Sequence, residues 1–91
     1  MAGALDLRDT FYEWTNDLFG SLPFDLKQAN LMGLVAALSL GNQRGVSYFY
    51  GAAKKAGATD EELTAAVSIS VAATGLHLYG LAGEAAKASE S

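Results

Sequence analysis

The stretch Leu38–Leu63, LSLGNQRGVSYFYGAAKKAGATDEEL, decides the fold of this chain. It contains the end of one predicted helix, the whole of a second and the start of a third. Gly41 follows an apolar run and suits a helix C-cap, because glycine enters the left-handed backbone region without steric cost. Lys54 and Lys55 precede Gly57, and basic side chains in the last turn favour the helix dipole. A helix over about Asn42–Ala56 is therefore predicted, with Gly57 as its cap.

The end of the stretch predicts the start of the next helix. Thr59 and Glu62 have the spacing of a capping box, in which each side chain bonds the other residue's backbone amide. We expect this helix to run to about Thr74. Gly75 allows a bend, and Leu76–Ala88 then forms either a fifth helix or a kinked extension. Residues 88–91 are expected to fray.

Upstream of the stretch, the pattern is also helical. Leu7, Phe11, Trp14 and Leu18 form one apolar stripe on a helix predicted over Asp6–Phe19, and we expect Phe11 and Trp14 to pack onto the rest of the protein. Pro23 prevents a simple continuation. The next helix, from Phe24 or Asp25 to Leu40, is apolar nearly all round and is therefore expected at the centre. The fold class predicted is all-α, a bundle of four to five helices in a single domain over residues 1–91.

Composition predicts self-association. The 91 residues are 51% hydrophobic and only 18% charged. A chain of this length buries about 60–65% of its unfolded surface. Because the apolar excess is more than one small domain hides easily, we expect part of it to face other copies in a homo-oligomer.

Charge and cysteine content exclude several function classes. The formal net charge is −4, the pI is near 4.6 and no basic stripe is present, so nucleic-acid binding is not expected. The absence of cysteine removes disulfides, thiolate nucleophiles and cysteine-ligated metals. No cofactor or metal is expected. The N-terminus MAGALDLRD has no signal-peptide pattern, so a cytoplasmic location is predicted.

One segment resembles a membrane span. Val67–Gly83 carries no formal charge, but it is rich in Ser, Thr and Gly and falls just short of the ~18–20 apolar residues that a span requires. The interpretation preferred from sequence is a buried core helix, with no membrane partner.

The order of these segments resembles a known family. The run LKQANLMGLVAALSLGNQRGVSYFYGAAKKAGATDEELTAAVSISVAATG is similar, without gaps, to the core of the carboxymuconolactone decarboxylase and AhpD-like superfamily. Its members show an apolar helix ending in glycine, a helix with C-x-x-C-x-x-x-H, and an AGAT-x-EE-like turn. The resemblance implies an all-α fold assembled as trimers, hexamers or larger rings. In the redox branch, it implies thiol chemistry assisted by a glutamate.

The residues of that chemistry are absent here. Where the resemblance places the two cysteines, this chain has Asn42 and Gly45, and where it places the histidine it has Phe49. The glutamate position holds Asn30. The decarboxylase branch usually keeps the histidine, so its mechanism is also in doubt. Thiol peroxidase or disulfide reductase activity is therefore not expected, and whether the chain is an enzyme stays open.

The remaining polar residues each have two interpretations. His77, the only histidine, is either a catalytic base in a cleft or a histidine bonded to a backbone carbonyl. Asn42 either lines the pocket or caps its helix. Arg44 either binds a carboxylate or pairs with an acid of another subunit. Tyr48 lines a pocket or an interface, and Phe49 fills the space of the missing histidine.

Three hypotheses follow. The first is a homo-oligomeric family member without thiol redox chemistry that binds a small molecule or a partner at Asn30, Asn42, Arg44, Gly45, Tyr48 and Phe49. The second is a decarboxylase or lactone-processing enzyme using His77 with Asn30 or Tyr48. The third is a purely structural oligomeric module.

Overall fold

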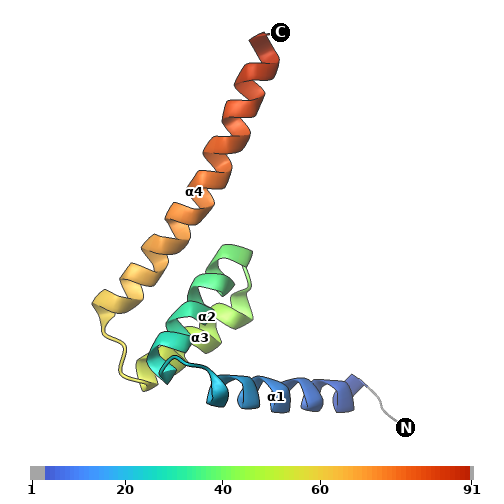
Figure 1. The fold of residues 1–91 in the computed structure, drawn as a ribbon, viewed down its shortest axis with the longest axis vertical. Helices are drawn as coiled ribbons and strands as arrows, with labels where there is room; N and C mark the ends of the chain where they lie inside the picture. The colour runs from blue at the N-terminus through green and yellow to red at the C-terminus, as the bar shows by residue number, and fades with distance from the viewer. Residues whose placement is uncertain (1–3, 91) are drawn as a thin grey trace.

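The computed structural model describes residues 4–90, with side chains from residue 7 onward, and that part of the chain is all-α with four helices (Figure 1). Helix α1 covers Ala4–Ser21, α2 covers Leu26–Leu40, α3 covers Gln43–Lys55 and α4 covers Asp60–Glu90. Helices α2 and α3 form a hairpin, and the first half of α4 packs along α2. Helix α1 runs off to one side of the hairpin, and the second half of α4 projects beyond it (Figure 1).

The predicted helix boundaries around the opening stretch are confirmed by local hydrogen bonds. Gly41 ends α2 in the left-handed region with φ 68°. Asn42 caps α3, since its Oδ1 accepts from the Gly45 amide at 3.1 Å. Thr59 and Glu62 make both bonds of the capping box, at 2.9 and 3.1 Å. Each bond satisfies a backbone amide that lacks a partner within the helix.

A second capping box opens α2. The Gln28 amide donates to Asp25 Oδ1 at 2.7 Å, and the Asp25 amide donates to Gln28 Oε1 at 3.2 Å. This box places the start of α2 immediately after Asp25, whereas the sequence pattern allowed Phe24 or Asp25 as the first residue. Its signal, an acidic residue followed three positions later by Gln, is present in the sequence.

The core is small and lies between α2, α3 and the first half of α4. Its buried members are Leu34, Ala53, Leu63 and Ala66, with Phe49 and other partly buried side chains around them. Only Leu34 and Leu63 are both large and fully buried among the described residues. The Lys27 ammonium also contacts the Glu62 carboxylate at 3.0 Å and links α2 to α4. The expected central position of α2 is therefore confirmed.

Two expectations about α1 and α4 are wrong for the single chain. Phe11 and Trp14 do not pack onto the rest of the molecule but are 56% and 58% exposed. The segment Val67–Gly83 is not a buried helix, because Ser70 is its only buried residue. Both segments carry apolar side chains that the rest of the described chain does not cover.

Helix α4 also runs without interruption through Gly75 and continues through residues 88–90, where the sequence predicts fraying. Gly75 has no neighbouring atom that demands a bend, and one glycine costs a helix only about 1 kcal/mol. In the described part of the chain, α4 is the one helix whose length and composition would suffice to cross a membrane.

Candidate functional site

Three of the four positions that the family resemblance assigns to chemistry, Asn42, Gly45 and Phe49, have structural roles in this chain. Asn42 is the cap of α3. A β-carbon added at Gly45 would be 2.9 Å from Nδ2 of Asn42, the cap of its own helix, and 3.0 Å from the Ala37 β-carbon of α2. A cysteine at Gly45 would therefore push the two helices apart, so the glycine sets how closely α3 approaches α2.

Phe49 stands at the position where the family resemblance places the histidine. Its ring lies directly on Gly33 of α2, where an added β-carbon would be 2.5 Å from Cδ1 and Cε1. The other side of the packing involves α1, because the Phe19 ring stacks on Phe49 with centroids 5.9 Å apart. Phe49 thus joins the end of α1 to the hairpin.

Asn30 is the buried polar residue of this region, with 7% of its surface exposed. Its Nδ2 donates to the Leu26 carbonyl at 2.8 Å. Within the described residues, its Oδ1 has no hydrogen-bond partner, and no fully inaccessible side-chain polar atom lacks one. The Oδ1 atom is therefore both accessible to solvent and free to accept a hydrogen bond.

A hollow lies where the end of α1 approaches α2 and α3, and it is named here the α1 hollow. Its volume is about 230 Å³, and it is lined by Thr15, Asn16, Phe19, Gly20, Leu26, Asn30 and Tyr48. Phe19 and Leu26 supply apolar walls, whereas Asn16, Asn30 and Tyr48 supply hydrogen-bonding groups. No charged side chain is in this lining. Such a surface suits a small neutral molecule with an apolar ring and a donor group.

The hollow combines predicted and unpredicted residues. Asn30 and Tyr48 were candidates from sequence, and the structure brings them to one hollow. Thr15, Asn16 and Phe19 were missed, because α1 was interpreted only through its apolar stripe. Their one sequence signal is position: they close α1 just before the SLPF turn that brings the chain back to α2.

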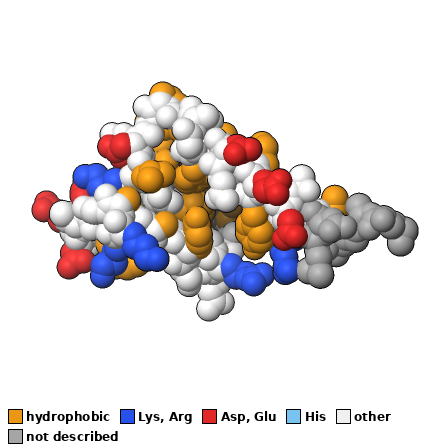
Figure 2. All heavy atoms as spheres, turned by 90° about the horizontal axis from the view of Figure 1, so that it is seen from below, with side chains coloured by type: hydrophobic (Ala, Val, Ile, Leu, Met, Phe, Trp, Pro, Cys, Tyr) orange, Lys and Arg blue, Asp and Glu red, His pale blue; other side chains and the backbone are white. Residues whose placement is uncertain are grey.

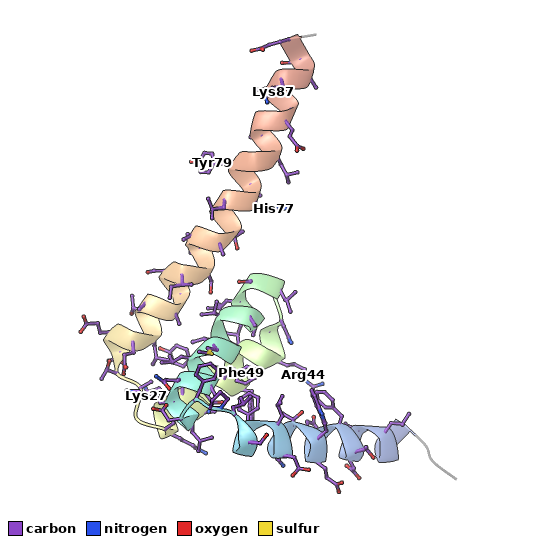
Figure 3. All side chains as sticks on the ribbon, in the orientation of Figure 1. Lys27, Arg44, Phe49, His77, Tyr79 and Lys87 are labelled. Atoms are coloured by element: carbon purple, nitrogen blue, oxygen red, sulfur yellow. The ribbon has the colours of Figure 1, made fainter. Side chains whose placement is uncertain are left out.

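The remaining candidates lie elsewhere. Arg44 is exposed at the start of α3 and makes no ion pair with another described residue. His77 is exposed on the projecting half of α4. Figure 3 shows it well separated from Phe49 of α3. It is not part of the α1 hollow lining. Within one chain, the geometry does not bring His77 together with Asn30 or Tyr48.

Two apolar grooves lie between α2 and α4. The first, about 300 Å³, is named here the α4 groove and is lined by Leu38, Val67, Ser70, Val71, Thr74, Gly75 and Leu78. The second, about 250 Å³, is lined by Leu31, Met32, Val35, Glu62, Ala65, Ala66 and Ile69. Neither has the set of hydrogen-bonding groups found in the α1 hollow. Across residues 4–90, no three His, Asp or Glu side chains gather in a way that could hold a metal ion.

Comparison with known proteins supports the resemblance seen in the sequence. Searches of curated proteins and of solved structures found no match. The sequence model of the carboxymuconolactone decarboxylase family matches residues 6–87, which is nearly the whole chain and reaches into all four helices. The chain therefore belongs to the carboxymuconolactone decarboxylase family.

Proposed function

We propose that this protein is a homo-oligomeric member of its family that binds a small neutral molecule in the α1 hollow and performs no thiol redox chemistry. One observation carries the proposal. Three of the family positions, Asn42, Gly45 and Phe49, serve capping and packing, while the hollow beside them is open and is lined by the fourth, Asn30, whose Oδ1 is a free acceptor.

The missing thiol chemistry follows from composition. Peroxide or disulfide reduction by this family's route begins with a thiolate nucleophile, and the chain contains no cysteine. We expect the purified protein, with dithiothreitol as reductant, to consume hydrogen peroxide no faster than buffer alone. Turnover above that background would contradict this part of the proposal.

The chemistry of the hollow selects neutral ligands. Asn16, Asn30 and Tyr48 exchange hydrogen bonds with amides, phenols or lactone carbonyls, but they cannot neutralise a buried carboxylate. The net charge of −4 also disfavours anions. Benzamide and benzoate are a suitable pair of probes, since they have the same shape and differ in charge.

The test is a titration of the labelled protein followed by NMR. We expect benzamide to shift the resonances of Asn16, Asn30 and Tyr48, and benzoate at the same concentration to leave them unchanged. Asn30→Leu, which keeps the branched shape of the side chain and removes the acceptor together with the donor to Leu26, should weaken benzamide binding at least tenfold. Equal shifts with both probes, or shifts confined to the α4 groove, would contradict the assignment of the ligand site.

Self-association is supported by the exposure of the apolar stripe on α1 and of the second half of α4. We propose a closed assembly, a trimer or a hexamer, in the cytoplasm. Light scattering coupled to gel filtration measures the mass of the particle in solution. A mass of 9.5 kDa, that of one chain, over the micromolar range would contradict this part of the proposal without affecting the ligand titration.

A further inference from the structure

The projecting half of α4 has an apolar surface that its own chain does not cover. Val71 and Leu78 are 66% and 57% exposed, and no charged residue occurs between Leu63 and Gly83. A helix that meets water on every side normally carries charged residues on its outer face. Figure 2 views the other end of the molecule, where α1 lies, and shows hydrophobic side chains in the middle of that face as well, with charged side chains toward its rim. Contiguous exposed apolar surface of this kind marks an interaction site.

One row of residues on α4, apolar apart from Thr74, has a regular spacing. Val67, Val71, Thr74, Leu78 and Leu81 follow one another at intervals of four, three, four and three residues. We call this row the α4 stripe. Its first four members line the α4 groove. The spacing is that of a helix that packs lengthwise against another helix, with side chains of one set between those of the other.

Helix α1 carries a second row with the same spacing. Leu7, Phe11, Trp14 and Leu18 follow at intervals of four, three and four residues, and the first three are more than half exposed. We call this row the α1 stripe. It extends over roughly 16 Å of helix, against roughly 21 Å for the α4 stripe from Val67 to Leu81, at 1.5 Å per residue. The two stripes therefore match in spacing and in mainly apolar character, and the α1 stripe is short enough to lie within the α4 stripe.

The two stripes cannot cover each other within one chain. Helices α1 and α4 point away from the hairpin in different directions (Figure 1). The substantial helix contacts are those of α2 with α3 and of α2 with α4. The partner of each stripe therefore comes from outside the chain.

The exposed area is large enough for an extensive interface. The accessible area is 6994 Å², whereas a compact 9.5-kDa monomer has about 5,000 Å². The radius of gyration is 17.6 Å, against about 12 Å for a compact chain of this length. The excess, roughly 1,500–2,000 Å² per chain, is the amount that one partner contributes to a permanent interface.

We propose that the α1 stripe of one copy packs on the α4 stripe of a second copy. Because the two surfaces differ, the contact closes either as a reciprocal pair or as a ring in which each copy supplies both. This inference rests on the proposed self-association but not on ligand binding. It accounts for both exposed stripes with one contact, whereas pairing α4 with α4 would leave α1 uncovered.

A lipid partner fits the composition of α4 less well. The first turn of α4 carries Asp60, Glu61 and Glu62, and the last turn contains Lys87 beside Glu90. These ends lack the basic clusters that hold a helix at an anionic membrane surface. The α1 stripe, on a helix with both acidic and basic residues, would also remain uncovered by a single spanning α4.

Three variants test the contact through the mass of the particle in solution, measured by sedimentation velocity. We expect Leu78→Glu in the α4 stripe and Phe11→Lys in the α1 stripe each to reduce the assembly to single chains. Ala72→Glu adds the same charge to the same helix on the face opposite the α4 stripe, among the exposed Ile69, Leu76 and Tyr79, and it tests whether that face makes the contact instead. It should keep the wild-type mass. Circular dichroism checks that each variant remains helical, and Leu81→Glu replaces Leu78→Glu if that variant unfolds.

Mixing the two disruptive variants gives the sharper test. In an equimolar mixture, one contact pairs the native Phe11 with the native Leu78, while another brings the introduced lysine of one variant to the introduced glutamate of the other. We expect the mixture to recover a mass above that of one chain, although neither variant does so alone. Recovery should weaken as salt increases, because it includes a charge pair.

The possible failures are distinguishable. Wild-type protein of one-chain mass contradicts both the proposed self-association and this contact. An assembled wild type whose mass persists in Phe11→Lys, or breaks in Ala72→Glu, contradicts only the pairing of α1 with α4. A monomeric wild type that floats with phosphatidylcholine vesicles would assign the α4 stripe to lipid and overturn the proposal.

Discussion

The Phe49 ring of α3 lies on Gly33 of α2 so closely that an added β-carbon would be 2.5 Å from two of its ring atoms. No β-carbon fits at that distance unless the ring or the helix moves. The two residues are therefore coupled: the large side chain at the family's histidine position depends on a glycine on the facing helix. The same ring also holds the end of α1 through Phe19.

The first prediction concerns this pair. Gly33→Ala should lower the free energy of unfolding by about 1–3 kcal/mol, the usual cost of overfilling a packed site. Gly51→Ala in α3 is the matched control, because no atom lies within 4 Å of its added β-carbon. It should raise stability by about 0.5–1 kcal/mol through helix propensity. Urea unfolding measures both, and equal effects of the two substitutions would contradict the assigned contact.

The second prediction concerns restoring a cysteine. Gly45→Cys should destabilise the fold by about 1–3 kcal/mol, because its β-carbon would meet Ala37 at 3.0 Å. Adding Ala37→Gly should recover part of that loss beyond its own helix-propensity cost of about 1 kcal/mol. A double-mutant cycle in urea measures this coupling. Strictly additive effects would show that Ala37 is not the obstacle.

The third prediction concerns the start of α4. Thr59→Ala removes the hydroxyl that accepts from the Glu62 amide, and should cost about 0.5–2 kcal/mol. Thr59→Ser keeps a hydroxyl and should stay close to wild type. Thermal unfolding of the three proteins compares them, and an equal loss in both variants would indicate that the methyl group, not the cap, matters.

The fourth prediction concerns acid stability. The Thr59 amide, and after it the Lys27 ammonium, lowers the pKa of Glu62 below its ordinary value of 4.5. A lowered pKa in the folded state gives stability that is present above pH 4.5 and lost as the pH falls through the lowered value. The lowered pKa of Glu62 therefore predicts a small loss of folding stability when the pH falls below 4.5.

Glu62→Gln tests the origin of this loss. Glutamine still accepts from the Thr59 amide but cannot titrate or pair with Lys27, so the variant should lack that part of the acid dependence. Lys27→Met removes only the second cause and should give an intermediate slope. Denaturant midpoints between pH 2.5 and 6 supply the measurement, and an unchanged slope in Glu62→Gln would contradict the prediction.

The features predicted well from sequence are those decided by neighbouring residues. The Asn42 cap and the Thr59–Glu62 box each involve atoms three residues apart, so local chemistry is sufficient to fix them. The order and type of the helices follow from the same signals. The prediction of a bend or break at Gly75 was wrong, because a glycine permits a bend without imposing one and no packed neighbour demands it.

The features predicted poorly depend on partners at a distance. Whether Phe11 is buried depends on what faces α1, and the apolar stripe alone does not identify that surface. The α1 hollow depends on how the SLPF turn returns the chain, which places Asn16 of α1 beside Asn30 of α2. Asn30 was identified from sequence only because the family resemblance places a glutamate at its position.

The small core has a consequence for the cell. With Leu34 and Leu63 as the only large, fully buried side chains in the described region, little of the folding free energy is available inside one chain. On the proposed assembly, the remainder comes from association, and stability then depends on how much of the protein is present. Such a protein persists when it is abundant and becomes a substrate for proteolysis when it is dilute, so its amount regulates its own lifetime.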